Sequence, residues 1–118
     1  MRRAEATADV TATGPIAMAP EHEGIVLDIL DTHLPAGTAI WAFGSRVNGR
    51  ARRYSDLDLA IDAGRRLTID ETAILREAFD ESDLPYRVDV VDWQAIGAEF
   101  RSLIAADRRR LARASTPA

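Results

Sequence analysis

The segment 56–62, Asp-Leu-Asp-Leu-Ala-Ile-Asp, alternates strictly between apolar residues and residues that are acidic or small. Successive side chains of a strand point to opposite faces, which separates Leu57, Leu59 and Ile61 from Asp56, Asp58, Ala60 and Asp62. Aspartate is a poor strand residue, so the placement of Asp56 and Asp58 on one face is locally unfavourable. Their side chains lie about 7 Å apart along a strand and repel each other unless a cation lies between them.

A second acidic strand follows later in the chain. Asp89 is flanked by Val88 and Val90, which must point the opposite way, into a core. If the two strands pair, Asp56, Asp58 and Asp89 converge on one patch, and such hard oxygen ligands suit Mg²⁺ or Mn²⁺. The alternative is that these aspartates form the solvent face of an amphipathic strand. The metal site is favoured because the acidic face carries only aspartate and alanine, and because the pattern occurs twice.

The remaining periodicity predicts an α/β (α+β) domain, a small mixed sheet with helices packed on one face. The apolar stripe of 20–34 predicts a helix, and the apolar run 38–43 predicts a central strand. Thr68 and Glu71 can form a capping box for a helix that reaches about residue 82. The residues expected to face the core from that helix are Ile74, Leu75, Ala78 and Phe79. A third strand is expected over 86–91, followed by a last helix, capped by Asp92 or a neighbour, that carries Ile96, Phe100, Leu103, Ile104 and Leu111.

The length of 118 residues allows one domain with one core. We predict a disordered tail over 1–18, the folded domain over 19–113 and frayed residues over 114–118. The tail lacks the apolar region of a signal peptide, and no segment approaches the roughly 18 apolar residues of a membrane span. These features predict a cytoplasmic protein without a membrane partner.

The charge distribution narrows the choice of ligands. A formal net charge of -4 argues against a direct affinity for nucleic acid, which requires a basic surface. There are no cysteines, so disulfides and thiolate metal sites are excluded. All 15 basic residues are arginines, so any phosphate must be bound by a guanidinium group or by backbone N–H groups.

Gly44 and Ser45 directly follow the strand expected over 38–43. A glycine at this position lets the backbone approach a ligand closely. If a short helix starts at Ser45, its free N–H groups and the serine hydroxyl form an anion pocket. Most Gly-Ser pairs are plain turns, so the informative feature is their distance in sequence from the aspartates.

Ten residues separate Gly44-Ser45 from Asp56-Leu57-Asp58. This spacing resembles the G-S-x(10)-D-x-D signature of the nucleotidyltransferase superfamily that shares the polymerase beta fold. The segment is most similar to the minimal nucleotidyltransferase branch, whose further positions are matched by Arg46, Gly49, Ala51, Arg52 and Ser55. Asp89 matches the third carboxylate. The resemblance covers roughly residues 22–112, and it implies an antitoxin that acts on a helical HEPN toxin.

The resemblance also implies roles for individual residues. Asp56 and Asp58 would bridge two divalent ions, Mg²⁺ or alternatively Mn²⁺, and Asp89 would share one ion and could accept a proton. The nucleotide-binding residues would be Gly44, Ser45, Arg46, Arg52 and Ser55, which would cradle or neutralise the phosphates of a nucleoside triphosphate, ATP being expected. Loop arginines in solvent are an equally good interpretation of Arg46 and Arg52.

The chain departs from the branch at Asn48, where arginine is common, and at Arg53-Tyr54, where proline and an acidic residue are common. Arg50 and Arg53 are nearby substitutes for the missing guanidinium. Asp62 and Asp92 end their strands, where aspartate commonly has a capping role.

Three functions remain open from the sequence. The first is transfer of a nucleoside monophosphate, AMP from ATP, to a hydroxyl of a HEPN toxin, because so short a chain lacks a platform for an acceptor and needs a partner. The second is transfer to a small molecule of the aminoglycoside type, for which homo-oligomerisation would have to build the pocket. The third is a non-catalytic antitoxin that neutralises its partner by binding, in a hetero-oligomer.

Overall fold

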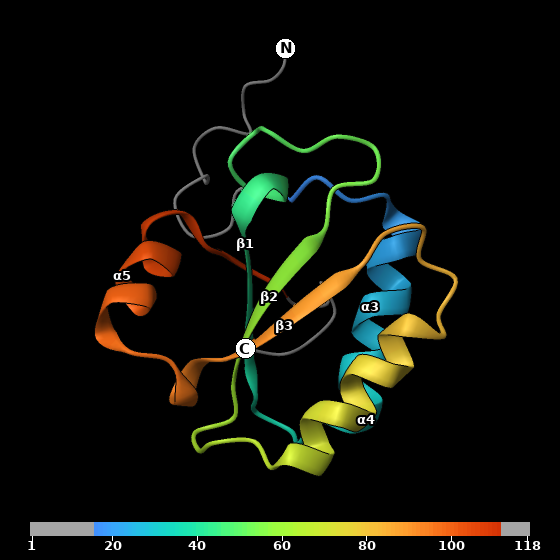
Figure 1. The fold of residues 1–118 in the computed structure, drawn as a ribbon. Helices are drawn as coiled ribbons and strands as arrows, with labels where there is room; N and C mark the ends of the chain where they lie inside the picture. The colour runs from blue at the N-terminus through green and yellow to red at the C-terminus, as the bar shows by residue number, and fades with distance from the viewer. Residues whose placement is uncertain (1–15, 112–118) are drawn as a thin grey trace.

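The computed structural model describes residues 16–111. Residues 1–15 of the tail expected over 1–18, and the frayed end expected over 114–118, lie outside the described residues. The elements, in chain order, are α3 (Pro20–His33), β1 (Ala39–Phe43), the 3-10 turn η1 (Gly44–Arg46), β2 (Leu57–Asp62), α4 (Ile69–Asp80), β3 (Val88–Asp92), the 3-10 turn η2 (Trp93–Ala95), α5 (Ala98–Asp107) and β4 (Arg109–Arg110). Figure 1 shows their arrangement around the sheet.

The sheet is mixed, as expected, with the strand order β3-β2-β1-β4. β1 pairs antiparallel with both β2 and β4, whereas β2 and β3 are parallel and are joined by the crossover helix α4. Parallel neighbours require such a crossover, and this one brings the two acidic strands side by side. The predicted class, an α/β domain built on a small mixed sheet, is therefore confirmed.

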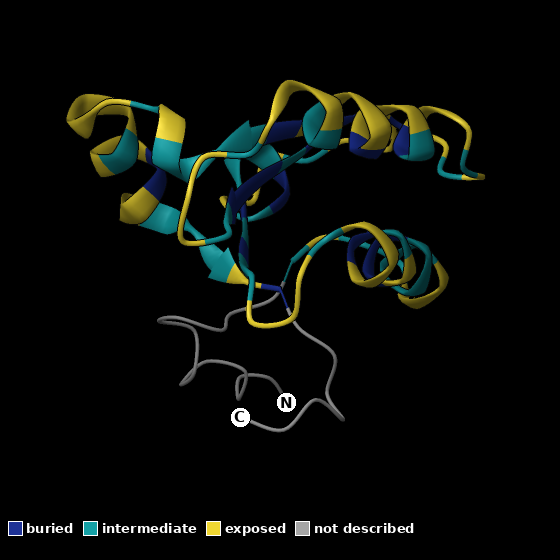
Figure 2. Ribbon diagram, turned by 90° about the horizontal axis from the view of Figure 1, so that it is seen from below, coloured by how far each residue is buried: buried dark blue, intermediate teal, exposed yellow. Residues whose placement is uncertain are grey.

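α3 and α4 cover one face of the sheet, as Figure 2 shows when the sheet is viewed nearly edge-on. Leu57, Leu59 and Ile61 are fully buried against these helices, in one core with residues of α3, α4, β1 and β3. α5 differs from the expectation of helices on one face, because it lies over the opposite face. There Phe100 of α5 meets Phe43 of β1 edge to face, with ring centroids 6.2 Å apart.

α4 begins as the sequence predicts. The Thr68 side chain accepts a hydrogen bond from the Glu71 backbone N–H, and the Glu71 side chain accepts one from the Thr68 N–H. Leu75 and Phe79 are buried as expected. The expectation for Ile74 is wrong, since its side chain is exposed. Only one stripe of α4 can face the sheet and α3, and Leu75 and Phe79 fill it.

The C-terminal region is the least well predicted. Asp92 caps η2, accepting a bond from the Gln94 N–H, and α5 begins later with Gly97 at its N-cap and no side-chain cap. Ile104 is buried, but Phe100 and Leu103 are exposed. The expected helical position of residue 111 is wrong: the chain leaves α5 after residue 107, forms β4 along β1, and brings the Leu111 side chain into the core from an extended segment.

The folded region begins earlier than expected. Ile16 and Met18 pack against the core, and the Ala17 N–H donates to the Arg46 carbonyl at 2.7 Å. The predicted boundary at 18/19 is therefore wrong for residues 16–18. These three residues form a strap across the loop that follows β1. Two apolar side chains next to one small residue are too short a pattern to be separated from a tail by sequence alone.

Candidate active site

The two acidic strands pair in a register that brings their aspartates together. Asp58 of β2 is the Cα partner of Asp89 on the parallel neighbour β3. Both lie on the sheet face opposite the buried Leu57 and Leu59, and Asp56 precedes β2 by one residue. The strand pairing on which the predicted convergence depends is thus present, and it brings Asp58 and Asp89 side by side.

The electrostatics of this cluster are unfavourable. The pKa of Asp58 is raised from 3.8 to about 6, chiefly by partial burial and further by the nearby carboxylates of Asp89 and Asp56. Burial and like charges both disfavour an ionised carboxyl group. The cluster is therefore arranged for a positive charge that would restore full ionisation.

The loop after β1 lies directly over Asp58. Gly44 has φ of 82°, in the left-handed region that glycine adopts without strain. A Cβ atom at Gly44 would overlap the Oδ2 atom of Asp58 and come within 3.3 Å of its Cγ. Gly44 is thus needed both for its backbone angle and for the close approach of a carboxylate. Ser45 follows within η1, and it is half-buried.

Arg46 is directed into the protein. Its side chain is only 7% exposed. The guanidinium donates to the Ser55 carbonyl from Nε at 3.0 Å and from Nη2 at 2.9 Å, to Arg53 O at 3.2 Å and to Ala17 O at 2.6 Å. Its Cζ atom lies 3.8 Å from the centre of the Tyr86 ring. The structure therefore does not place this guanidinium among the carboxylates or in an open phosphate site.

Arg52 and Ser55 belong to one turn of the same loop. The Arg52 N–H donates to the Ser55 hydroxyl at 2.8 Å, and the Ser55 N–H donates to Arg52 O at 3.1 Å. The Arg52 side chain is exposed, as are those of Arg50 and Arg53. These three side chains remain available to a phosphate, whereas the Ser55 hydroxyl is engaged within the loop.

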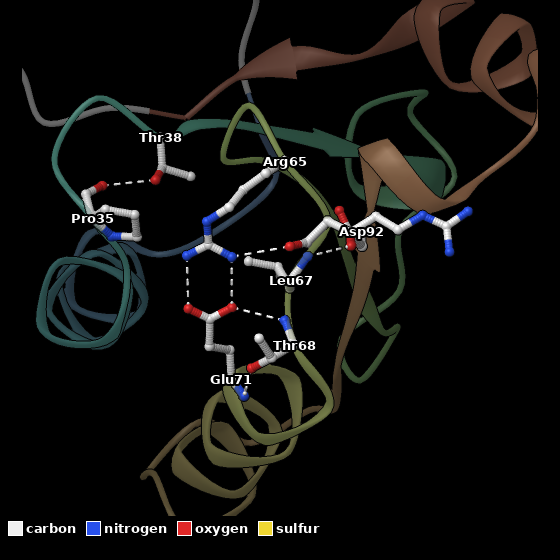
Figure 3. Close-up of polar contacts among 8 residues, drawn as sticks. Pro35, Thr38, Arg65, Leu67, Thr68, Glu71 and Asp92 are labelled. Carbon is white, nitrogen blue, oxygen red and sulfur yellow. Dashed lines mark hydrogen bonds and ion pairs between the residues drawn. The ribbon is translucent and has the colours of Figure 1, made fainter.

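The aspartates at the opposite end of the sheet have other partners. Asp62 Oδ1 accepts bonds from the Gln94 side chain and from the Gly64 N–H, and the Gln94 bond is the main reason why the pKa of Asp62 is lowered. Asp92 Oδ2 accepts from the Leu67 N–H at 2.8 Å, beside the Arg65–Glu71 ion pair and the start of α4 (Figure 3). Both residues thus fix connections between elements, in line with the capping role considered for strand ends.

The donor set fits a hard divalent cation. Carboxylate oxygens are what Mg²⁺ and Mn²⁺ prefer, and the cluster holds three of these groups with mutual repulsion. Between residues 16 and 111, no three acidic or histidine side chains are drawn together as closely as a bound ion would hold them. Asp56 and Asp89 are exposed and can rotate toward Asp58 when a cation is present.

Sequence reasoning missed two contributors to this region. Tyr86 was expected as the first residue of a strand, but its ring is buried beneath Arg46, and its hydroxyl has no hydrogen-bond partner in the described part of the chain. Ala17 contributes through its backbone alone. A backbone contact of this kind leaves no signal in the side-chain pattern.

The comparison with known proteins agrees with the geometry of the site. Residues 26–116 match the family described as "Polymerase beta, Nucleotidyltransferase". The chain belongs to this nucleotidyltransferase family. It is also 45% identical over 95 residues, which are 80% of this chain and 82% of the relative, to a protein of Haemophilus influenzae named "Probable protein adenylyltransferase MntA".

Two solved structures share the fold of this nucleotidyltransferase. One is a crystal structure of a toxin–antitoxin with AMP-PNP, with a TM-score of 0.66 and 25% identity, covering 79% of this chain and 74% of the other. The second is a mutant MntA–HpeT toxin–antitoxin, with a TM-score of 0.65 and 22% identity over the same shares of the two chains. None of the helices described in the present chain is long and apolar enough to cross a membrane.

Proposed function

We propose that this nucleotidyltransferase is a Mg²⁺-dependent adenylyltransferase that transfers AMP from ATP to a hydroxyl group of a HEPN-type toxin and thereby acts as its antitoxin. The observation that carries the proposal is the in-register pair Asp58 and Asp89, with Gly44 closely packed against Asp58. The name of the Haemophilus relative supports AMP as the transferred group, and the toxin–antitoxin structures support a toxin as the partner.

We assign metal binding and phosphate binding to separate residues of the chain. Asp56, Asp58 and Asp89 would hold the metal, which supplies Lewis-acid stabilisation of the phosphates and of the attacking oxygen. Ser45 and the N–H groups of the Gly44 loop would hold the β- and γ-phosphates. Arg52, exposed at the loop surface, is the guanidinium we assign to their charge.

The transfer itself needs one proton acceptor. The acceptor hydroxyl oxygen forms a bond to the α-phosphorus as the bond to pyrophosphate breaks. Asp89 is exposed on the edge strand β3, so an incoming hydroxyl can reach it, and it takes the proton of that hydroxyl. Pyrophosphate leaves with the negative charge that develops on the bridging oxygen.

A second protein is needed for the acceptor. One sheet face is covered by α3 and α4, and α5 lies over part of the other (Figure 2). The described chain has no further layer that could bind and orient an acceptor beside the carboxylates. A toxin that docks on the carboxylate end would bring its own hydroxyl. We take the HEPN toxin to be a ribonuclease, and a phosphate ester added beside its active site would repel RNA.

The direct test is incubation of the protein and its co-expressed toxin with ATP and Mg²⁺, followed by intact-mass measurement of the toxin. We expect the toxin to gain whole multiples of the mass of one AMP residue. Asp56→Asn and Asp58→Asn should retain at most a few per cent of this transfer, whereas Asp62→Asn, on the same strand face, should remain close to wild type. Equal silencing of an unmodified toxin by wild type and Asp58→Asn would instead establish neutralisation by binding alone.

A further inference from the structure

We infer that Arg46 and Ser55 are positioning residues, which fix the metal-binding Asp56 from behind instead of contacting the phosphates. The inference rests on the proposed function, in which Asp56 is a metal ligand. It assigns to both residues a task that differs from nucleotide binding and that concerns the geometry of the carboxylate cluster.

Arg46 holds the loop at the peptide unit that joins Ser55 to Asp56. Two of its guanidinium N–H groups, on Nε and Nη2, converge on the Ser55 carbonyl oxygen at 3.0 and 2.9 Å. That carbonyl belongs to the same planar peptide unit as the nitrogen of Asp56. Because the peptide unit is rigid, holding its oxygen also restricts the orientation from which the Asp56 side chain leaves the backbone.

Ser55 holds the other side of the same turn. Its hydroxyl accepts from the Arg52 N–H at 2.8 Å, and its own N–H donates to Arg52 O at 3.1 Å. Arg46 adds a bond to Arg53 O at 3.2 Å. The turn 52–55 is therefore tied at successive peptide units immediately before Asp56.

Arg46 is itself anchored on a buried aromatic ring. Its guanidinium stacks 3.8 Å from the centre of the Tyr86 ring, and Tyr86 is 91% buried two residues before β3. Reciprocal bonds join it to the strap, with Arg46 donating to Ala17 O and the Ala17 N–H donating to Arg46 O. One guanidinium thus connects the loop that carries Asp56 to the segment that leads into β3, the strand that carries Asp89.

A phosphate role for Arg46 would require this assembly to be dismantled. The side chain would have to give up four hydrogen bonds to carbonyl oxygens and its contact with Tyr86. Partly buried carbonyls that lose their donors are unfavourable, so the arginine is retained where it is. The exposed Arg52 can reach a phosphate without any such loss.

The test measures binding of Mn²⁺ alone by electron paramagnetic resonance, with no nucleotide present. Arg46→Gln should weaken Mn²⁺ binding about tenfold or more, the usual effect of removing a group that orients a metal ligand. Ser55→Ala should weaken it in the same direction and by less, because Arg46 stays in place. Arg66→Gln removes an exposed arginine of the loop between β2 and α4, which follows the end of β2 opposite to Asp58; it is the charge-matched control and should bind Mn²⁺ like wild type.

The outcomes separate this inference from the proposed function. If Arg46→Gln and Ser55→Ala bind Mn²⁺ like wild type, and Arg46→Gln loses affinity for ATP measured in EDTA, Arg46 is a phosphate ligand and the inference is overturned. If wild type and Asp58→Asn bind Mn²⁺ equally, the metal centre of the proposed function fails instead. Thermal melts of every variant identify any that does not fold; should Arg46→Gln be one, Ser55→Ala decides the question alone.

Discussion

Asp58→Asn should make the metal-free protein more stable while it abolishes transfer. Asp58 is half-buried between two other carboxylates, and its pKa is raised from 3.8 to about 6. A difference of that size corresponds to about 3 kcal/mol between the two protonation states without screening. Because the side chain is partly exposed, screening by solvent reduces the stabilisation expected from neutral asparagine to about 1 kcal/mol at pH 7.5.

The sign of the effect fixes its dependence on pH. The folded protein binds the Asp58 proton more tightly than the unfolded chain does, so stability falls as the pH rises from 3.8 through about 6. Above pH 6 the full destabilisation by the ionised carboxylate is present, and below about 4 it is absent. The stability advantage of Asp58→Asn should therefore be largest at neutral pH and disappear near pH 4.

Urea denaturation with EDTA present measures the free energies of unfolding of wild type and Asp58→Asn, at pH 7.5 and at pH 4. Asp62→Asn is the matched control on the same strand face: hydrogen bonds lower the pKa of Asp62, so this variant should gain no stability at pH 7.5. Mg²⁺ should stabilise wild type and not Asp58→Asn, since only a bound ion shifts the unfolding equilibrium. An Asp58→Asn protein that is no more stable than wild type at pH 7.5 would refute the electrostatic argument.

Three further perturbations test the fold around the site. Gly44→Ala should lower the free energy of unfolding by about 2 kcal/mol or more and abolish transfer, because its Cβ atom has no room beside Asp58. Gly49→Ala shares the positive φ but its Cβ atom faces open space, so urea denaturation should show a loss of only about 1 kcal/mol. Thr68→Ala should lower the free energy of unfolding by about 1 kcal/mol through loss of the capping box and leave the rate of transfer unchanged; a slower rate would link α4 to the site. Removal of residues 1–18 should lower the melting temperature by several degrees relative to removal of residues 1–15, because only the shorter truncation keeps the strap 16–18. Equal melting temperatures of the two truncated proteins would show that the strap does not contribute to stability.

The acidic strands could be predicted because periodicity is a local property. Alternation over 56–62 fixes which side chains share a face, and the burial of Leu57 and Leu59 follows it. The alignment of Asp58 with Asp89 is not local: it depends on how far the crossover through α4 shifts one strand along the other. The sequence could therefore state the convergence only as a condition.

The role of Arg46 could not be predicted for a different reason. A guanidinium has five donors that suit carbonyl oxygens and phosphate oxygens equally well. Its sequence position next to Gly44-Ser45 favours neither. The deciding contact is with Tyr86, which lies 40 residues away in the chain and has an unremarkable local pattern. Apolar periodicity has a different limit, because it does not show whether another element covers the apolar side chains. Three side chains that it placed in the core are exposed: Ile74, Phe100 and Leu103.

The two ends of one acidic strand face show why aspartates of similar sequence context have different tasks. At the Asp62 end, a side-chain amide and a backbone N–H satisfy the carboxylate, and the pKa is lowered. At the Asp58 end, burial and two further carboxylates raise the pKa, and no donor or cation in the described chain contributes to it. The carboxylates at the Asp58 end do not stabilise the fold. The fold maintains it through Gly44, which makes room for the carboxylate, and through the Arg46 anchor, which keeps the loop over it. Devices that hold repelling charges together are explained by a ligand of opposite charge, and this is the physical reason to place the divalent ion at Asp58 and not at Asp62.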